Sequence, residues 1–357
     1  MKKEVYSKPF NLVIENRYPN LLIGPGFYNS FSSAKKSDPK NWSLKKIDEI
    51  DFQRKTQEFA FREFDKKEAI NPKRELGDIQ WITQSVKTTE FEIEVNSNKN
   101  KTIIDSVTGI KNNSFTLNNL KITKNIKVPK VIDKVTNDIS LLARDGILEL
   151  YSKSEDVYKI EQLLSIGLLG IKRNRVFVPT RWAVTSVDDI VGKDIINNLR
   201  LNQTIDSFEL FNFSFLKNKF YIILLPYSWG FEMIENQNSS FTVDYEIGIP
   251  KKEYAKNVTG AYYAARLEVA KYFKLKKRQG MCIVFRDIDF DYYSRGVWVI
   301  REAIKLALKN KPINFESQEE LFTYLDNILK IKNTSKYWKE QSNLIKNIKN
   351  QKRIFEF

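Results

Sequence analysis

Residues 163–189 bring together side chains that suit the binding of a phosphate-bearing partner. Two glycines, Gly167 and Gly170, end an apolar run, and a basic cluster and a tryptophan follow. The residues assigned to phosphate binding here are Lys172, Arg173, Arg175, Thr180, Arg181 and Trp182. Guanidinium groups match phosphate oxygens bidentately, so this composition favours such a ligand. The competing interpretation is structural: a glycine-ended helix, an exposed basic turn, and a new helix capped by Ser186.

Cations from other segments extend this prediction. Arg266 and Arg301 are added to the phosphate-binding set, and a predicted helix ends in Lys276, Lys277 and Arg278. If these segments converge, phosphate contacts would give salt-sensitive, sequence-tolerant binding. Trp182 or Trp229 would then be available to stack on an unpaired base. The alternative is a scattered basic surface with the tryptophans in the core.

Carboxylates offer a second, enzymatic interpretation. The candidate catalytic residues are Asp188, Asp189, Glu232 and Glu302, each close to aromatic or basic residues. A metal-dependent nuclease or phosphoesterase acting on damaged DNA would use such groups to hold Mg²⁺ or Mn²⁺. Helix caps and surface ion pairs explain each acid individually, because the four are far apart in the sequence. No reaction, and no metal site, is assigned from these residues.

Histidine is absent from the chain, and cysteine occurs once, at Cys282. Nucleophilic systems that pair serine or cysteine with histidine are therefore excluded. Cys282 lies in an apolar run, which favours a place in the core. One cysteine without histidine provides neither a disulfide nor a zinc site, so no zinc is expected.

The composition supports a globular protein with an acidic partner. The chain has 357 residues and a formal net charge of +15, with a pI of about 9.5. This charge favours an acidic partner such as nucleic acid or an anionic surface. The chain has no apolar stretch of the roughly 18 residues that a membrane-spanning helix needs, and no signal peptide, so we expect a cytoplasmic protein without a membrane partner.

Periodicity predicts an α+β fold of mixed helices and antiparallel strands, in one large domain or two closely packed domains. Strands are expected at 12–14 and 21–23, the second ended by Gly24–Gly26, then a loop at 30–40 and an alternating strand at 91–95. Short strands separated by turns at 112–113 and 118–119 follow over 103–128. The other expected elements are helices at 78–86 and 131–153 and from Ser154, Ser186, Gly260, Gly296 and Ser317, a hairpin at 208–225 and a strand at 281–286.

The last residues suggest a docking peptide. Gln351 is followed by an aliphatic residue three positions later, Ile354, and by an aromatic residue six positions later, Phe357. This spacing resembles the sliding-clamp (PCNA) interacting motif, the PIP motif, of DNA-processing proteins. The usual motif has two adjacent aromatic residues, and the second is missing here.

Several stretches in order resemble the archaeal Nre family of DNA repair proteins, of the NreA type. They cover nearly the whole chain, and the most specific are VPTRW at 178–182 and YYAARL at 262–267. Others are RYPN at 17–20, DVYKI at 156–160, VDD at 187–189, FEM at 231–233, GVW at 296–298, Arg301-Glu302 and the C-terminal peptide.

The resemblance implies a role in the DNA damage response and clamp contact through Gln351, Ile354 and Phe357. It also implies an N-terminal region over 1–250, a C-terminal region over 251–335 and a basic tail over 336–357. The family's usual four-cysteine module is absent here, which puts zinc-dependent DNA contact in doubt. We therefore expect a DNA-binding repair protein; the alternatives are the nuclease described above and an adaptor without DNA contact of its own.

Overall fold

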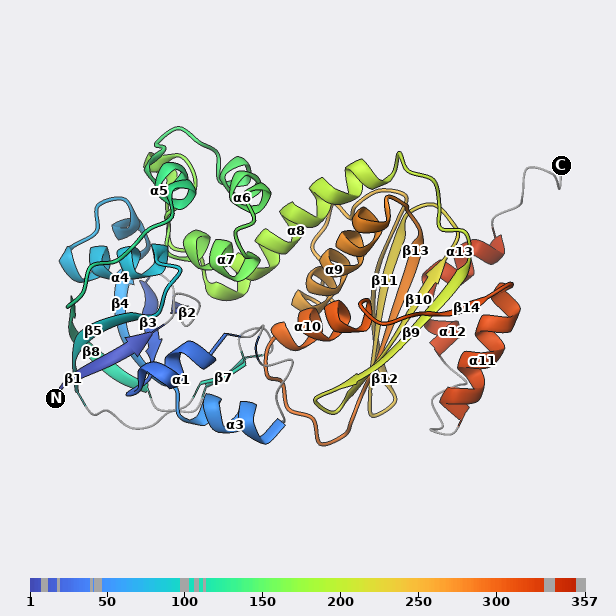
Figure 1. Ribbon diagram of the computed structural model, residues 1–357, viewed down its shortest axis with the longest axis horizontal. Helices are drawn as coiled ribbons and strands as arrows, with labels where there is room; N and C mark the ends of the chain where they lie inside the picture. The colour runs from blue at the N-terminus through green and yellow to red at the C-terminus, as the bar shows by residue number, and fades with distance from the viewer. Residues whose placement is uncertain are drawn as a thin grey trace. The chain divides into compact units, whose positions relative to one another are not determined.

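A computed structural model describes residues 1–7, 12–17, 20–38, 41, 47–96, 103–105, 109–111, 114–330 and 338–350. The chain forms two compact units, each built on its own six-stranded sheet (Figure 1). Unit 1 comprises Met1–Val191 with Ser294–Gly296, and unit 2 comprises Gly192–Tyr293 with Val297–Phe357. Both sheets are mixed and mostly antiparallel and are accompanied by helices, so the predicted α+β class is confirmed.

The sheet of unit 1 has the strand order β1-β5-β8-β4-β3-β2. In that order the strands are Lys2–Ser7, Thr89–Asn96, Ser114–Ile122, Glu58–Asp65, Asn20–Phe27 and Leu12–Arg17. Only β4 and β8 are paired in parallel. Strand β5 shows the expected period of two, because Phe91, Ile93 and Val95 are buried while the glutamates between them are more exposed. That alternation fixes which face of the sheet meets the core.

Helices and two short strands complete unit 1. They are α1 (Phe31–Lys36), α3 (Ile47–Lys55), η2 (Lys66–Ala69), α4 (Arg74–Gln84), α5 (Lys130–Asn137), α6 (Ala143–Ser152), α7 (Val157–Ser165), η3 (Lys172–Asn174), α8 (Thr180–Leu199), β6 (Ile103–Asp105) and β7 (Gly109–Lys111). Helix α4 packs on β8 and on α7, and α6 packs on both α5 and α7. The division between the two units falls within α8.

The sheet of unit 2 has the order β12-β11-β13-β10-β9-β14. The strands are Ser240–Ile247, Gly230–Gln237, Met281–Ile288, Asn218–Leu225, Phe208–Phe215 and Ile313–Phe315. The predicted hairpin at 208–225 is confirmed as β9 and β10. Leu216 and Lys217 form its two-residue turn with φ of 48° and 60°, the left-handed backbone that such hairpin turns require. Strand β13 lies in the middle, parallel to β11 and antiparallel to β10.

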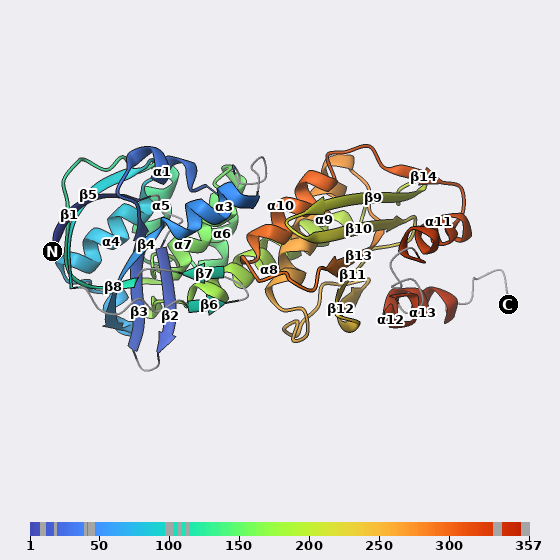
Figure 2. The same ribbon diagram turned by 90° about the horizontal axis from the view of Figure 1, so that it is seen from below.

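Helices cover both faces of this second sheet (Figures 1 and 2). One face packs on α9 (Gly260–Lys276) and α10 (Trp298–Ala307). The other packs on α11 (Gln318–Lys330), α12 (Trp338–Gln341) and α13 (Asn343–Asn350). Tyr221 and Ile223 of β10 belong to the core under α11–α13. Ile222 lies between them, points to the other face of the sheet and is equally buried. Burial on both faces explains why β10 and β13 read as continuous apolar runs.

Three sequence predictions about helix starts and loops are wrong. Helix α7 begins after Asp156, whose side chain accepts a hydrogen bond from Tyr158 N at 2.9 Å, and not at Ser154, whose φ is 66°. Helix α8 already begins at Thr180, so Ser186 caps nothing and Asp188 and Asp189 are not in a first turn. Residues 30–40, expected as a loop, contain the short helix α1 with Ser30 as its cap.

Two expected strand breaks are also wrong. Strand β3 continues through Gly24 to Phe27. A side chain at Gly24 would start 2.4 Å from Ala60 O, so this glycine permits close approach of β4 and does not end the strand. Asn118 and Asn119, predicted as a turn, lie within β8. The predicted turn at 112–113 lies outside the described residues.

Candidate nucleic-acid interface

The connection between α7 and α8 carries the predicted binding cluster, and its shape depends on Gly167. This residue has φ of 73°, and a Cβ there would lie 2.7 Å from Ala69 Cβ and 3.0 Å from Val176 O. Glycine alone fits such a position without strain. A backbone hydrogen bond from Val178 N to Ser165 O, at 2.9 Å, joins the far part of the connection to the end of α7. The connection is thus a fixed feature of unit 1.

Arg175 holds this connection from inside. Its Nε donates to Gly170 O at 2.8 Å, its Nη1 to Thr136 O at 2.8 Å and its Nη2 to Asp138 O at 2.7 Å. The side chain is buried, and this burial lowers the pKa of its guanidinium. The charge of Arg175 suggested phosphate binding. In the structure its guanidinium is instead buried, and its donors satisfy three backbone carbonyls.

Lys172, Arg173 and Trp182 remain at the surface. The two cations lie in η3, and the Lys172 backbone N–H is held by Ile139 O at 2.9 Å. Trp182, in the first turn of α8, keeps 55% of its surface exposed. The structure thus leaves two cations and one aromatic ring of the predicted cluster open to solvent.

Thr180 and Arg181 differ from those three. Thr180 is buried, and its hydroxyl accepts a hydrogen bond from Ile14 N in β2 at 2.8 Å. Its observed role is therefore to fix the start of α8 against the sheet, and not to face a phosphate. Arg181 is partly buried and has interactions within the protein.

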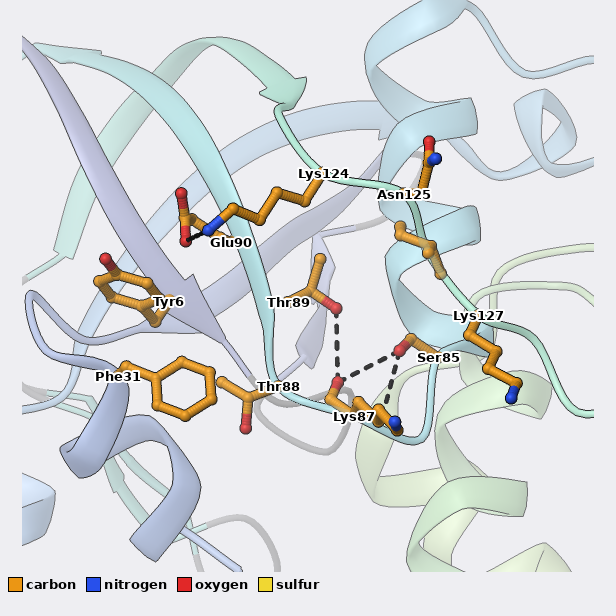
Figure 3. Close-up of a pocket in the computed structure, with 11 residues that line it drawn as sticks. Tyr6, Phe31, Ser85, Lys87, Thr88, Thr89, Glu90, Lys124, Asn125 and Lys127 are labelled. Atoms are coloured by element: carbon orange, nitrogen blue, oxygen red, sulfur yellow. Dashed lines mark hydrogen bonds and ion pairs between the residues drawn. The ribbon is translucent and has the colours of Figure 1, made fainter.

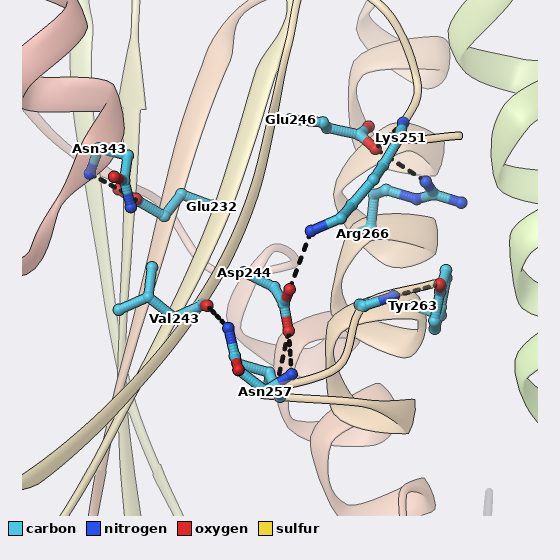
Figure 4. Close-up of polar contacts among 11 residues, drawn as sticks. Glu232, Val243, Asp244, Glu246, Lys251, Asn257, Tyr263, Arg266 and Asn343 are labelled. Carbon is cyan, nitrogen blue, oxygen red and sulfur yellow. Dashed lines mark hydrogen bonds and ion pairs between the residues drawn. The ribbon is translucent and has the colours of Figure 1, made fainter. Parts of the chain in front are cut away.

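Arg266, in unit 2, is completely buried in an ion pair. Its Nη1 donates to Glu246 at 2.9 Å (Figure 4). Its guanidinium lies over the rings of Tyr263 and Tyr262 at 5.3 and 5.7 Å. Trp229 Nε1 donates to the second oxygen of Glu246 at 3.0 Å. Arg266 and Trp229 were assigned to phosphate binding and base stacking; both instead serve the core of unit 2. The buried charges of Arg266 and Glu246 are thus paired with each other, as burial demands.

The acids of this network were missed by the sequence predictions. Asp244 and Glu246 alternate on one face of β12, and both are buried. Asp244 accepts hydrogen bonds from Asn257 N at 2.9 Å and Val258 N at 2.7 Å, and it pairs with Lys251 (Figure 4). Two acids that alternate along a strand usually indicate a face exposed to solvent. The sequence pattern therefore favours exposure of these two residues, although both are buried.

Of the other predicted cations, Arg301 and Arg278 interact within the protein, whereas Lys276 and Lys277 are exposed. Arg301 is buried in α10 and interacts within the protein. Arg278 donates to Gln203 Oε1 at 2.8 Å and pairs with Asp206. Lys277 takes the left-handed backbone conformation that ends α9.

The catalytic candidates occupy separate structural places. Asp188 is buried and Asp189 partly buried in the middle of α8. Glu232 is buried in β11 and accepts hydrogen bonds from the Ser342 hydroxyl and from Asn343 N at 2.7 Å. Glu302 is buried and paired with Lys305 at 3.2 Å. Within the described parts of the chain, no group of three or more acids, histidines or cysteines could hold a metal ion.

Two family models together span the chain. The model for the N-terminal region of archaeal Nre proteins matches residues 2–242, and the model for their C-terminal region matches residues 248–357. The chain belongs to the archaeal Nre family. The boundary between the two Nre regions falls inside unit 2, because β13 of the second region lies between β10 and β11 of the first.

Curated Nre proteins are close relatives over much of the chain. NreA of Archaeoglobus fulgidus is 33% identical over 316 residues, which cover 86% of this chain and 80% of that protein. NreB of the same organism is 33% identical over 240 residues, covering 64% and 60%. NreA of Haloferax volcanii is 33% identical over 209 residues, covering 55% and 50%. All three are named DNA repair proteins. No solved structure matches this Nre chain.

Two further predictions concern the sliding clamp and the membrane as partners. The clamp peptide, with Gln351, Ile354 and Phe357, lies outside the described residues. None of the helices in the described ranges is both long and apolar enough to cross a membrane.

Proposed function

We propose that this Nre protein acts in DNA repair and binds DNA through the exposed part of the α7–α8 connection in unit 1. The names of its relatives support the repair role. The observation that carries the binding site is the contrast within one short segment: Arg175 is buried and fixes the backbone, while Lys172, Arg173 and Trp182 project into solvent. A fixed backbone lowers the entropy lost when these side chains bind a ligand.

The exposed side chains suit two parts of a DNA strand. Lys172 and Arg173 would contact phosphates, while Trp182 would stack on an unpaired base. Arg181, next to Trp182, is retained as a further phosphate contact. Because phosphates are common to all sequences and every base has an aromatic face, this surface would bind single-stranded or frayed DNA with little sequence preference.

The test is a salt titration of binding to a labelled single-stranded oligonucleotide, measured by fluorescence anisotropy. Lys172→Ala/Arg173→Ala should reduce affinity by roughly tenfold or more and lower the slope of log K against log salt by about 1.4, since each phosphate contact on a single strand contributes about 0.7. Trp182→Ala should reduce affinity about five- to tenfold with the slope unchanged. Arg181→Ala should weaken binding with the fold intact.

A matched control is Arg144→Ala/Lys153→Ala, which removes the same charge from exposed positions on and just after α6 in unit 1. It should bind DNA like the wild type after correction for net charge. Equal losses in the control and in Lys172→Ala/Arg173→Ala would mean that only net charge matters, and the proposed surface would be abandoned.

We further propose that residues 351–357 dock the protein on the sliding clamp. The support is the motif itself, in which Gln351, Ile354 and Phe357 have the spacing of a peptide that inserts a glutamine and an apolar pair into neighbouring pockets. Deleting residues 351–357 should abolish capture by immobilised clamp. Lys352→Ala/Arg353→Ala, which leaves the three motif residues, should retain capture; retention by the deletion variant would refute the docking role.

A further inference from the structure

A pocket of about 490 Å³ lies at one edge of the sheet of unit 1, and its lining includes no residue of the α7–α8 connection. Four segments line it: Tyr6 of β1, Phe31 of α1, residues 85 and 87–90 before and at the start of β5, and residues 124–127 after β8. Its volume is within the range of small-ligand sites, about 300–1,000 Å³. None of these residues was singled out by the sequence predictions.

The charge of the pocket is positive. Its charged residues are Lys87, Lys124, Lys127 and Glu90. Lys124 pairs with Glu90 at 2.6 Å, which neutralises the one carboxylate (Figure 3). Among the residues that the structure describes, Lys87 and Lys127 have no carboxylate partner at their ammonium groups. Two such ammonium groups at the rim of a concave site favour an anionic group of a ligand.

Aromatic side chains line the same pocket as these cations. Figure 3 shows the rings of Tyr6 and Phe31 on one side of the pocket and the Lys124–Lys127 segment on the other. The two rings meet edge to face, with centroids 5.8 Å apart. Phe31 remains 52% exposed, so a large part of this side chain is accessible to a ligand. An exposed ring in the same pocket as two ammonium groups without a carboxylate partner suits a ligand with a planar apolar part and an anionic part.

Hydrogen bonds fix the turn that carries Lys87. Lys87 N donates to the Ser85 hydroxyl at 3.2 Å, and the Thr89 hydroxyl donates to Lys87 O at 3.4 Å. Beneath this turn, the buried ammonium of Lys159 in α7 donates to Thr83 O at 2.7 Å and to Ser85 O. These carbonyls end α4, and their partial negative charge would otherwise repel an anion. Lys159 therefore both fixes the turn and offsets that charge.

We propose that this pocket binds a phosphorylated nucleoside, with the phosphate between Lys87 and Lys127 and the base against Phe31. Two sources provide that chemistry: a free nucleotide and the 5′-phosphorylated end of a DNA strand. The site is independent of the DNA surface proposed above, because the two share no residue. No reaction is involved; the proposal concerns binding alone.

Isothermal titration of the full chain tests this with ADP, the 5′-phosphorylated dinucleotide pTpT, unphosphorylated TpT and pyrophosphate. Lys87→Ala/Lys127→Ala should weaken ADP binding at least tenfold. Phe31→Ala should weaken ADP binding about fivefold and leave pyrophosphate unchanged, since only the base contacts the ring. Preference for ADP over pTpT identifies a free nucleotide as the source, and the reverse identifies a strand end.

Lys73→Ala/Lys130→Ala is the matched control, since it removes two exposed lysines of unit 1 that do not line the pocket. It should bind ADP like the wild type. Absence of ADP and pTpT binding at millimolar concentration, or equal loss in the control, would overturn the proposal. Equal affinity for TpT and pTpT would also overturn it. Lys172→Ala/Arg173→Ala should keep ADP binding, which separates failure here from failure of the DNA surface.

Discussion

Arg175 in unit 1 and Arg266 in unit 2 are both buried, but they are stabilised in different ways. Arg266 pairs with the buried carboxylate of Glu246 and lies over two tyrosine rings. Arg175 donates to three backbone carbonyls of Gly170, Thr136 and Asp138. Loss of Arg266 leaves an unpaired charge in the core, whereas loss of Arg175 leaves three carbonyls without this donor but no unpaired charge. The same residue type therefore stabilises a core in one unit and shapes a surface in the other.

The largest effect is expected for Arg266→Ala, which should destabilise unit 2 by about 3–5 kcal/mol because it isolates the Glu246 carboxylate. Urea unfolding followed by tryptophan fluorescence would measure it. Arg278→Ala, which breaks the exposed pair with Asp206, should cost less than about 1 kcal/mol. In a double-mutant cycle, Arg266→Met/Glu246→Gln should recover part of the loss, because glutamine removes the charge and keeps an acceptor for Trp229 Nε1. Equal costs for Arg266→Ala and Arg278→Ala would contradict the buried-pair account.

Arg175→Ala should have a smaller effect on global stability, about 1–3 kcal/mol, but a local one on the α7–α8 connection. Hydrogen exchange of amides 172–177 should rise, and DNA affinity should fall although Arg175 itself is buried. Arg175→Lys should not restore either property, because one ammonium cannot reproduce the planar fork that reaches three carbonyls. Arg144→Ala in the same unit serves as the control. Unchanged exchange in Arg175→Ala would show that the connection holds its shape without this anchor.

Alanine substitutions at Gly167 and Gly77 provide a sharper test of that connection, because we expect them to change the free energy of unfolding in opposite directions. Gly167→Ala should destabilise by about 1–3 kcal/mol, since its φ of 73° and its neighbour Ala69 leave no room for a methyl group. Gly77 lies inside α4 with nothing within 4 Å of an added Cβ. Gly77→Ala should therefore stabilise by about 0.5–1 kcal/mol. Thermal unfolding of both variants measures the difference; stabilisation by Gly167→Ala would mean that the connection is not strained.

The smallest expected effect concerns Glu232, a buried acid without the arginine partner that Glu246 has. Burial raises its pKa, although hydrogen bonds from Ser342 and Asn343 oppose this shift. The folded state therefore binds a proton at Glu232 more tightly than the unfolded chain does, and stability falls as the pH rises from the ordinary glutamate range through the raised pKa. Glu232→Gln should lessen this fall, measured by urea unfolding across that range. Exposed Glu319→Gln should behave like the wild type.

The sequence predicted the parts of the fold that depend on local periodicity. The alternation around Phe91 gave β5, and the hairpin at 208–225 and the strand at 281–286 were confirmed, because one buried face or a continuous apolar run leaves a direct pattern. Helix starts were less predictable. Ser154 and Asp156 are both good caps, and the choice between them depends on tertiary packing that no local pattern records.

The candidate site shows a different limit. Arg173 and Arg175 are two residues apart and indistinguishable by charge, yet one is exposed and the other is buried. Their difference depends on where the carbonyls of Thr136 and Asp138 lie, and those residues are more than thirty positions earlier. The pocket lined by Tyr6 and Lys127 was invisible for the same reason, since its walls come from four distant segments.

The central place of β13 in the second sheet has a practical consequence. A fragment that stops near residue 245 would lack the strand that joins β10 to β11, and the missing strand would leave two unpaired apolar edges inside one polypeptide. Such edges invite intermolecular pairing, so we expect the fragment to precipitate or to be degraded. Adding the complementary fragment, residues 246–357, during refolding should rescue it, because the second piece supplies that strand.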